Sequence, residues 1–273
     1  MSKPLDVSQP NSIRIGAVTY LNAKPLIVSL AQQTPHAQIV IDYPSRLADA
    51  LMDGRLDVAI IPSIEYARHP GCTIVSDACI ACDGPVQSVK LYSRVPFEQI
   101  QTLALDEGSR TSSTLARIIL KEQFDLCPAI CELPIEALID DVWADAMVLI
   151  GDRGMLSAGG NFKFVWDLGE QWSLWTGLPF VFAMWIARPG VDLQGLEDAL
   201  AAARNDGLTR LEEIARTEAP VLGLSEAECL SYLRDHLKFH LGDRQRQALE
   251  LFYSLAARQA LAPVGVKLAF YHS

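Results

Sequence analysis

The sequence has no long hydrophobic run and no basic face, and both deficits narrow the class of protein it encodes. Among its 273 residues, no uncharged apolar run reaches the ~18–20 residues of a membrane span. The longest candidate, residues 172–187, is interrupted by Gly177 and Pro179. Lys and Arg number 23 against 33 Asp and Glu, and they are scattered along the chain. We therefore expect neither a membrane nor a nucleic acid as the main partner, although a net charge of −10 does not prevent a small anion from binding locally.

Motifs for nucleotide binding, serine hydrolysis and metal chemistry are missing as well. There is no P-loop, no GxGxxG fingerprint and no GxSxG nucleophile elbow. Cys79 and Cys82 have CxxC spacing, but they lack a second pair and a helix start that would activate a thiol. His236 and His240 lack a third ligand and a metalloprotease glutamate. We therefore predict no metal site.

The N-terminus lacks the apolar segment and the cleavage site of a secretory signal, and we expect it to form a short polar arm. The expected compartment is the cytoplasm, where cysteines stay reduced. The cysteines lie among apolar neighbours, as buried small residues do. They are Cys72, Cys79, Cys82, Cys127, Cys131 and Cys229.

The remaining composition is that of a globular protein, with 50% hydrophobic and 21% charged residues. Short apolar runs alternate with helical patterns over the first two thirds of the chain, which is typical of βαβ units and a parallel sheet. The expected strands of a first set are 13–18, 38–43, 57–61 and 72–82, with helices near 25–32 and 45–53. After an extended segment at 88–92 the pattern restarts, with strands at 102–106, 129–133 and 145–150, a helix after 108–112 and a short helix at 135–139.

The last part of the chain has apolar residues at helical spacing. The expected helices are 193–204, 208–216, 225–240 and 243–260. Residues 225–228 fit a capping box, and Asp243 is a suitable N-cap. The segment 263–271 is either a last strand or a docked tail.

These patterns predict an α/β fold of two lobes arranged as a clamshell, with C-terminal helices. We assign residues 1–91 and 187–273 to a discontinuous first lobe, and residues 92–186 to an inserted second lobe. A ligand would then bind in the cleft between the lobes, at the carboxyl ends of strands.

Polar residues follow the expected strands at 19–22, 62–66, 109–112 and 151–154. The segment 108–114 is the strongest candidate, because its glycine permits a tight turn and a helix N-terminus with hydroxyls favours an anion. Arg110 could add a bidentate contact to a carboxylate. Ser and Thr are equally typical as plain N-caps, so both interpretations stay open.

Other candidates carry weaker signals. Asn22 alone is more typical of an N-cap than of a ligand contact, and Ser88 and Lys90 lie on the expected crossover between the lobes. An aromatic-rich segment favours core packing, with one or two rings as walls of an apolar pocket. It contains Trp166, Trp172, Trp175, Phe180, Phe182 and Trp185.

Six sequence blocks together resemble the chorismate dehydratases of the futalosine route to menaquinone. The blocks are TYLNAKPL at 19–26, DVAIIPSIEY at 57–66, SVKLYS at 88–93, SRTS at 109–112, LIGDR at 149–153 and WTGLPFVFAMW at 175–185. The resemblance covers about residues 13–270, in the expected order. The N-terminal arm and the Cys79–Cys82 pair depart from the family pattern.

The resemblance implies a fold like that of type II periplasmic binding proteins. It also implies dehydration of chorismate to 3-[(1-carboxyvinyl)oxy]benzoate, without a metal or an organic cofactor. Carried over from the motifs, Asn22 and Ser88 would contact the reacting region. The expected substrate-binding residues are Tyr20, Ser63, Lys90, Ser109, Arg110, Thr111, Ser112, Asp152, Pro179 and Phe180.

No residue is an obvious general base. Glu65 and Asp152 are the nearest candidates, but Glu65 is more typical of a structural residue and Asp152 of one that orients Arg153. The enolpyruvyl carboxylate of the substrate is the alternative base. Two other functions remain open, a non-catalytic anion-binding protein and the sister enzyme that makes dihydroxynaphthoate, although the blocks at 19–22 and 88–90 speak against the sister enzyme.

Overall fold

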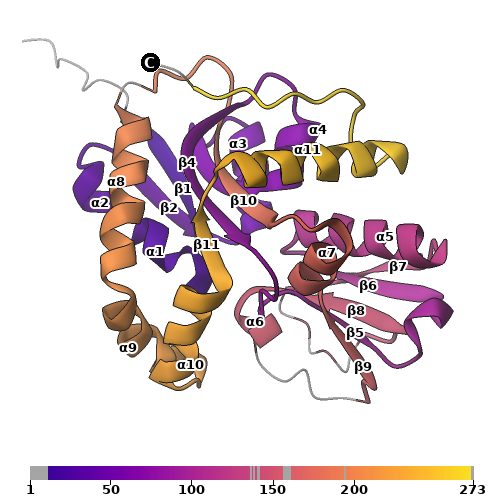
Figure 1. The fold of residues 1–273 in the computed structure, drawn as a ribbon. Coiled ribbons are helices and arrows are strands. Elements are labelled where there is room, and N and C mark those ends of the chain that lie inside the picture. Colours follow the sequence, from indigo (N-terminus) through magenta and orange to yellow (C-terminus); the bar gives the residue numbers. More distant parts are fainter. Residues whose placement is uncertain are drawn as a thin grey trace, which may run out of the picture.

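The structure is a computed structural model that describes residues 12–135, 137, 139, 142–155, 161–193 and 195–271. It contains two β-sheets that lie side by side as two lobes, each with helices packed against it (Figure 1). The α/β fold with two lobes and C-terminal helices, predicted from the alternating pattern, is confirmed.

The first sheet has six strands in the order β11-β4-β10-β3-β1-β2. They are β1 (Arg14–Val18), β2 (Gln38–Asp42), β3 (Val58–Pro62), β4 (Thr73–Cys82), β10 (Phe180–Ala187) and β11 (Leu237–His240). Strand β1 pairs in parallel with β2 and β3, whereas β10 runs antiparallel to β3 and β4. Strands β3 and β10 are buried at every position, which is why their sequences are continuous apolar runs without alternation.

Helices pack against this sheet, with α3 on β3, α8 on β4 and α11 on β10. The helices of this lobe are α1 (Lys24–Ile27), α2 (Leu30–Gln33), α3 (Pro44–Met52), α4 (Ser63–Arg68), α8 (Leu196–Thr209), α9 (Leu211–Leu222), α10 (Glu226–Ser231) and α11 (Asp243–Arg258). A 3-10 turn, η1 (Leu21–Ala23), precedes α1, and a π-helical turn, η4 (Tyr232–His236), follows α10.

The second sheet has five strands in the order β7-β6-β8-β5-β9. They are β5 (Lys90–Ser93), β6 (Thr102–Asp106), β7 (Ala129–Leu133), β8 (Ala146–Leu149) and β9 (Phe164–Asp167). Strand β6 is parallel to β7 and β8, and β5 is antiparallel to β8 and β9. The accompanying elements are η2 (Phe97–Gln99), α5 (Arg110–Phe124), α6 (Gly151–Met155) and α7 (Leu168–Thr176).

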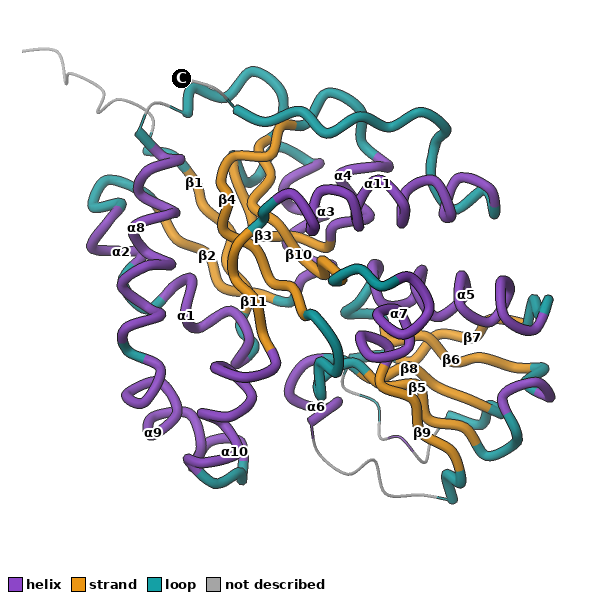
Figure 2. Tube along the Cα trace, viewed as in Figure 1, coloured by secondary structure: helices purple, strands orange, loops and turns teal. Residues whose placement is uncertain are grey.

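Two loop segments join the sheets, residues 83–89 between β4 and β5 and residues 177–179 between α7 and β10 (Figure 2). The predicted boundaries differ from this division at both ends. Residues 90 and 91, which were assigned to the first lobe, begin β5 of the second sheet. Residues 180–186, which were assigned to the second lobe, lie in β10 of the first sheet, because the apolar strand fills the gap between β3 and β4. The division into two domains stays a prediction.

Three local expectations were wrong. The helix expected at 225–240 ends early, and Leu237–His240 forms β11 because the edge of β4 offers backbone hydrogen bonds that helical spacing cannot reveal. The helix expected near 25–32 is split into α1 and α2. Gly242, not Asp243, is the N-cap of α11. The capping box at 225–228 is confirmed.

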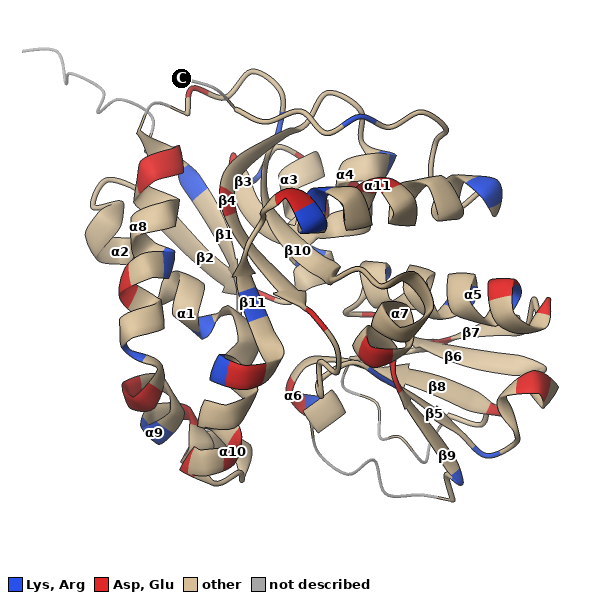
Figure 3. Ribbon diagram, viewed as in Figure 1, with Lys and Arg blue, Asp and Glu red and all other residues tan. Residues whose placement is uncertain are grey.

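The end of the chain is a docked tail. The Ile74 N–H donates to the Ala269 carbonyl at 2.9 Å, and the Tyr271 N–H donates to the Ile74 carbonyl at 2.8 Å. The Tyr66 hydroxyl donates to the Lys267 carbonyl at 2.8 Å. The N-terminal arm lies outside the described residues, and so does part of the helix expected at 135–139. Within the described part of the chain, no helix is long and apolar enough to cross a membrane. Acidic and basic residues are interspersed over both lobes (Figure 3).

Asp57, directly before β3, ties three strands of the first sheet together. Its carboxylate accepts hydrogen bonds from the Arg14 backbone at 2.9 Å, from the Arg14 guanidinium at 2.8 and 2.9 Å, and from Arg188 after β10 at 2.6 Å. These donors hold the pKa of the Asp57 carboxyl well below its usual range.

We expect Asp57→Asn to lower the free energy of unfolding by about 1–2 kcal/mol at pH 7, since the charged hydrogen bonds are lost but both arginines are partly exposed. Because the folded pKa is depressed, this stabilisation is complete above the unfolded pKa of ~3.9 and is lost as the pH falls toward the folded value. Urea unfolding should therefore show the gap between variant and parent narrowing below about pH 4.

Asp53→Asn is the control, because Asp53 is 63% exposed and pairs only with exposed Arg55 at 3.1 Å. Its effect should stay within about 0.5 kcal/mol. Equal effects of the two variants would contradict the structural role of Asp57.

Candidate functional site

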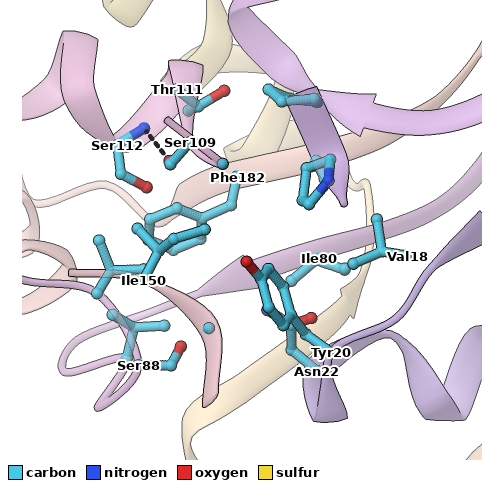
Figure 4. A pocket seen from close by; sticks show the side chains of 17 residues that line it. Val18, Tyr20, Asn22, Ile80, Ser88, Ser109, Thr111, Ser112, Ile150 and Phe182 are labelled. Atoms are coloured by element: carbon cyan, nitrogen blue, oxygen red, sulfur yellow. Dashed lines mark hydrogen bonds between the residues drawn. The ribbon is translucent and has the colours of Figure 1, made fainter. Parts of the chain in front are cut away.

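A cavity lies where the two lobes face each other (Figure 4). Its wall is formed by strand ends of the first sheet, the connection at 86–89, the start of α5 and the end of β8. The lining residues are Val18, Tyr20, Asn22, Pro44, Pro62, Ile80, Val86, Ser88, Val89, Gly108, Ser109, Thr111, Ser112, Ile150, Gly151, Phe182 and Ala183. The cavity therefore lies at the carboxyl ends of strands, as the fold predicts.

The lining is neutral, because none of these residues carries a charged side chain. Its polar groups are one amide, one phenol and four hydroxyls. They come from Asn22, Tyr20, Ser88, Ser109, Thr111 and Ser112. Apolar walls with a few convergent polar groups are typical of small-molecule sites. An anion in this cavity would meet hydrogen-bond donors and backbone dipoles, with no side-chain cation in direct contact.

Helix α5 begins at the cavity wall. The Ser109 hydroxyl accepts a hydrogen bond from the Ser112 N–H at 3.2 Å, so the N-cap interpretation of this segment is confirmed. Asp106, at the end of β6, fixes the preceding turn by accepting the Gly108 N–H at 2.9 Å. The same turn lines the cavity, which places the positive end of a 15-residue helix against it. Capping and anion binding are thus compatible here.

Tyr20 and Asn22 come from the turn after β1. The N-cap of η1 is Tyr20, so the N-cap interpretation of Asn22 was wrong. The Asn22 Oδ1 is buried and finds no hydrogen-bond partner among the described residues. The Tyr20 ring packs on Gly151, where a Cβ atom would lie 2.9 Å from the ring and where φ is +58°. Only glycine accommodates both constraints. Burial raises the pKa of Tyr20, so its hydroxyl stays protonated.

Ser88 lies in the connection between the lobes and is fully buried. Its hydroxyl accepts a hydrogen bond from Tyr232 at 2.7 Å. Sequence reasoning missed Tyr232, because it lies among the C-terminal helices and belongs to no motif. In Figure 4, Ser88 and Asn22 lie toward one end of the cavity, and Ser109, Thr111 and Ser112 toward the other.

Two charged residues predicted to bind substrate join the lobes instead. The Arg110 guanidinium pairs with Asp49 at 2.7 Å and with buried Glu65 at 3.0 Å, both in the first lobe. The Asp152 carboxylate accepts the Leu21 N–H at 3.1 Å. Burial raises the pKa of Asp152. Neither side chain is part of the cavity lining.

Four more of the predicted binding residues also lie outside the lining, namely Ser63, Lys90, Pro179 and Phe180. The Ser63 hydroxyl donates to the Val181 carbonyl at 2.7 Å and lies 3.4 Å from the Thr111 hydroxyl. Lys90 is in β5, where burial lowers its pKa. Pro179 accepts the Trp172 indole N–H at 3.0 Å. Phe180 is buried against the same indole, with ring centroids 5.2 Å apart.

Phe182, two positions beyond Phe180, is the residue of the aromatic-rich segment that lines the cavity. Strand alternation could identify residues 180 and 182 as sharing a face, but not which of them reaches the ligand. Pro44 and Ile80 also belong to the lining, and only the packing of their elements places them there. No sequence signal distinguishes them from core residues.

Cys79 and Cys82 are buried free thiols, and burial raises the pKa of both. His236 contacts Gln87 at 2.8 Å, and His240 pairs with Asp77 at 3.0 Å. Among the residues that the structure describes, no group of three His, Cys, Asp or Glu side chains is placed to hold a metal ion.

Residues 13–258 match the model of a protein family described as menaquinone biosynthesis. The chain belongs to that family. The sequence resemblance stated above is therefore confirmed. A curated chorismate dehydratase from Thermus thermophilus is 28% identical over 87% of this chain and 93% of its own length. A second, from Campylobacter jejuni, is 30% identical over 62% of this chain and 64% of its own.

Several solved structures have a fold similar to that of this chain. A protein from Archaeoglobus fulgidus has a TM-score of 0.75 at 17% identity, covering 92% of this chain and 98% of that one. The alkanesulfonate-binding protein of Xanthomonas axonopodis pv. citri has a TM-score of 0.62 at 15% identity, covering 94% and 96%. A Candida albicans protein with the generic periplasmic binding protein fold scores 0.58 at 12% identity, covering 97% and 98%. This member of the family therefore has a fold like that of periplasmic binding proteins.

We expect Arg110→Gln to lower the free energy of unfolding by about 1–3 kcal/mol, because Glu65 is 2% exposed and would lose one of its cations. Chemical denaturation at pH 7 measures the change. Lys121→Gln is the control on the same helix, since the pair that Lys121 forms with Asp125 is exposed to solvent. If both variants were equally stable, Arg110 would not be holding the lobes together.

Proposed function

We propose that the protein dehydrates chorismate to 3-[(1-carboxyvinyl)oxy]benzoate. The observation that carries this proposal is the neutral interlobe cavity, with the start of α5 at one end and Asn22 and Ser88 at the other. The two curated relatives named chorismate dehydratase support it, and so does the menaquinone biosynthesis family.

The substrate is a small dianion, and its two carboxylates need donors. The hydroxyls of Ser109, Thr111 and Ser112 provide one set, at the positive end of α5. Tyr20 adds a protonated phenol to the wall. Because Ser63, Lys90, Arg110, Asp152, Pro179 and Phe180 lie outside the lining, we assign them no direct contact with the substrate.

The reaction removes one proton and one hydroxyl group from adjacent ring carbons. The C–H that breaks is on the ether-bearing carbon, and its electron pair is conjugated through a ring double bond to the ring carboxylate. Negative charge therefore grows on that carboxylate, where fixed donors stabilise it as an oxyanion hole does, by ~2.7–4 kcal/mol per good donor. Loss of hydroxide from the neighbouring carbon then completes the benzene ring. The released proton and hydroxide together make water.

The base in this proposal is the enolpyruvyl carboxylate of the substrate itself. No Asp, Glu, His or Lys side chain lines the cavity. Glu65 is occupied by Arg68 at 2.9 Å and Arg110 at 3.0 Å, and Asp152 by the Leu21 N–H. Asn22 and Ser88 then contact the reacting region, and the protein positions the carboxylate near the C–H bond.

The direct test is incubation of the purified protein with chorismate, followed by ultraviolet spectra and identification of the product. We expect aromatisation by the wild type, and a loss of about 10²–10³-fold in kcat for Ser88→Ala, the size of effect seen when a fixed donor is removed. Ser113→Ala on α5 is the control, because its hydroxyl has no hydrogen-bond partner in the described part of the chain and Ser113 does not line the cavity.

Two outcomes would contradict this function. Thermal stabilisation by chorismate without turnover would favour a non-catalytic binding protein, the activity that the alkanesulfonate-binding relative is named for. Conversion of a cyclised futalosine derivative in place of chorismate would favour the sister dihydroxynaphthoate synthase.

The identity of the base has its own test. Glu65→Gln and Asp152→Asn, assayed well below their melting temperatures, should each keep kcat within ~10⁴-fold of the wild type, since neither carboxylate removes the proton. A larger loss with substrate binding retained would assign the proton transfer to that residue. Kinetics on matched folded fractions, checked by circular dichroism, separates this from a loss of stability.

A further inference from the structure

Hydrogen bonds and a close backbone contact fix Ser88 and the residues just before it. The residue before it, Gln87, has φ of +65°, in the left-handed region that non-glycine residues rarely adopt. The Asp167 carboxylate fixes this conformation by accepting the N–H groups of Val86 at 3.0 Å and Gln87 at 2.6 Å. Backbone strain that the surroundings enforce is a marker of a functional position.

The carbonyl of Ser88 is fixed as well. Gly154, in α6, approaches so closely that a Cβ atom at this position would lie 2.2 Å from the Ser88 carbonyl oxygen. Only glycine permits this contact. The second lobe therefore holds the backbone just before Ser88 through Asp167, and it packs against the Ser88 carbonyl through Gly154.

The side chain of Ser88 is fixed by the first lobe, through Tyr232. The Tyr232 phenol is 1% exposed, and it donates a hydrogen bond to the Ser88 Oγ at 2.7 Å. The Asn22 side chain lies near the same phenol. Tyr232 therefore fixes one of the two residues expected to contact the reacting region and lies near the other, although it does not line the cavity itself.

This connection determines which groups remain for a ligand. A serine hydroxyl has one proton and two lone pairs. Because Tyr232 supplies the proton in its hydrogen bond with Ser88, Ser88 keeps its own proton to donate. Asn22, in turn, keeps the buried Oδ1 that has no partner among the described residues. The pair offers one donor and one acceptor, which is complementary to a substrate hydroxyl group.

We propose that Tyr232 is a positioning residue for the dehydration, and that it holds Ser88 as a donor to the leaving hydroxyl of the substrate, with the Oδ1 of Asn22 as the acceptor. This inference rests on the proposed function. As the C–O bond breaks, the Ser88 hydrogen bond stabilises the departing hydroxide. The proton taken from the ring carbon completes the water, so the protein gains and loses no proton. Burial raises the pKa of Tyr232, which keeps its hydroxyl protonated as a donor.

The test is a double-mutant cycle with chorismate as substrate. We expect Tyr232→Phe to lower kcat by about 10–100-fold with KM changed by less than about threefold, because the donor is misdirected while carboxylate binding is kept. In a Ser88→Ala background, the same substitution should cost less than about threefold, since the group it positions is gone.

Tyr66→Phe is the matched control. Tyr66 is 5% exposed, and its hydroxyl donates to the Lys267 carbonyl at 2.8 Å in the docked tail, outside the cavity lining. This variant loses a buried phenol hydrogen bond of similar length, but its kcat should stay within about twofold of the wild type.

Each outcome discriminates. Suppose that the wild type turns over chorismate and that Tyr232→Phe lowers kcat equally in both backgrounds, or lowers it in neither. This result would overturn the positioning role and leave the proposed function intact. Absence of wild-type turnover would overturn both.

If Tyr232→Phe does not unfold cooperatively, 3-fluorotyrosine at position 232 keeps the shape and makes the phenol more acidic. A change in kcat that disappears with Ser88→Ala would then support the role, and an unchanged kcat would overturn it.

Discussion

The contact between the first turn of α5 and the first lobe is the constraint on which the rest of the site depends. Thr111 accepts the Ile64 N–H at 3.2 Å, and Arg110 pairs with buried Glu65 at 3.0 Å. A buried carboxylate requires paired cations, so Glu65 stabilises the arrangement only while Arg110 reaches it. The same turn presents its hydroxyls to the cavity. The contacts that dock the two lobes therefore also set the position of the polar cavity wall.

Charged side chains form contacts between the lobes, whereas the side chains that line the cavity are neutral. Arg110 and Asp152 cross between the lobes, whereas the cavity is lined by hydroxyls, one amide and apolar walls. A lining without carboxylates avoids like-charge repulsion against a dianion, which would be strong in a site that excludes water. Donors fixed before the substrate arrives need no reorganisation when charge moves onto a carboxylate, and this suits a reaction that develops charge on the substrate itself.

Ser88 shows how distant parts of the chain fix one side chain. Asp167 of the second lobe holds the two residues before it, Gly154 packs against its carbonyl, and Tyr232 of the C-terminal segment donates to its hydroxyl. The connection between the lobes is thus a rigid platform at this position. The C-terminal helices do more than cover the first sheet, because the turn that follows α10 carries Tyr232 to the cavity wall.

The sequence by itself determined the alternation of strands and helices, the N-cap at Ser109 and the motif segments that carry Tyr20, Asn22 and Ser88, because local spacing and turn chemistry are written in neighbouring residues. Only the tertiary structure decided that Arg110 faces Glu65 instead of the cavity, and that Leu237–His240 forms a strand on β4. It also decided that Tyr232 meets Ser88 across 144 positions of the chain. Such outcomes depend on which partner a side chain or strand edge finds after packing, and that information is not local in sequence.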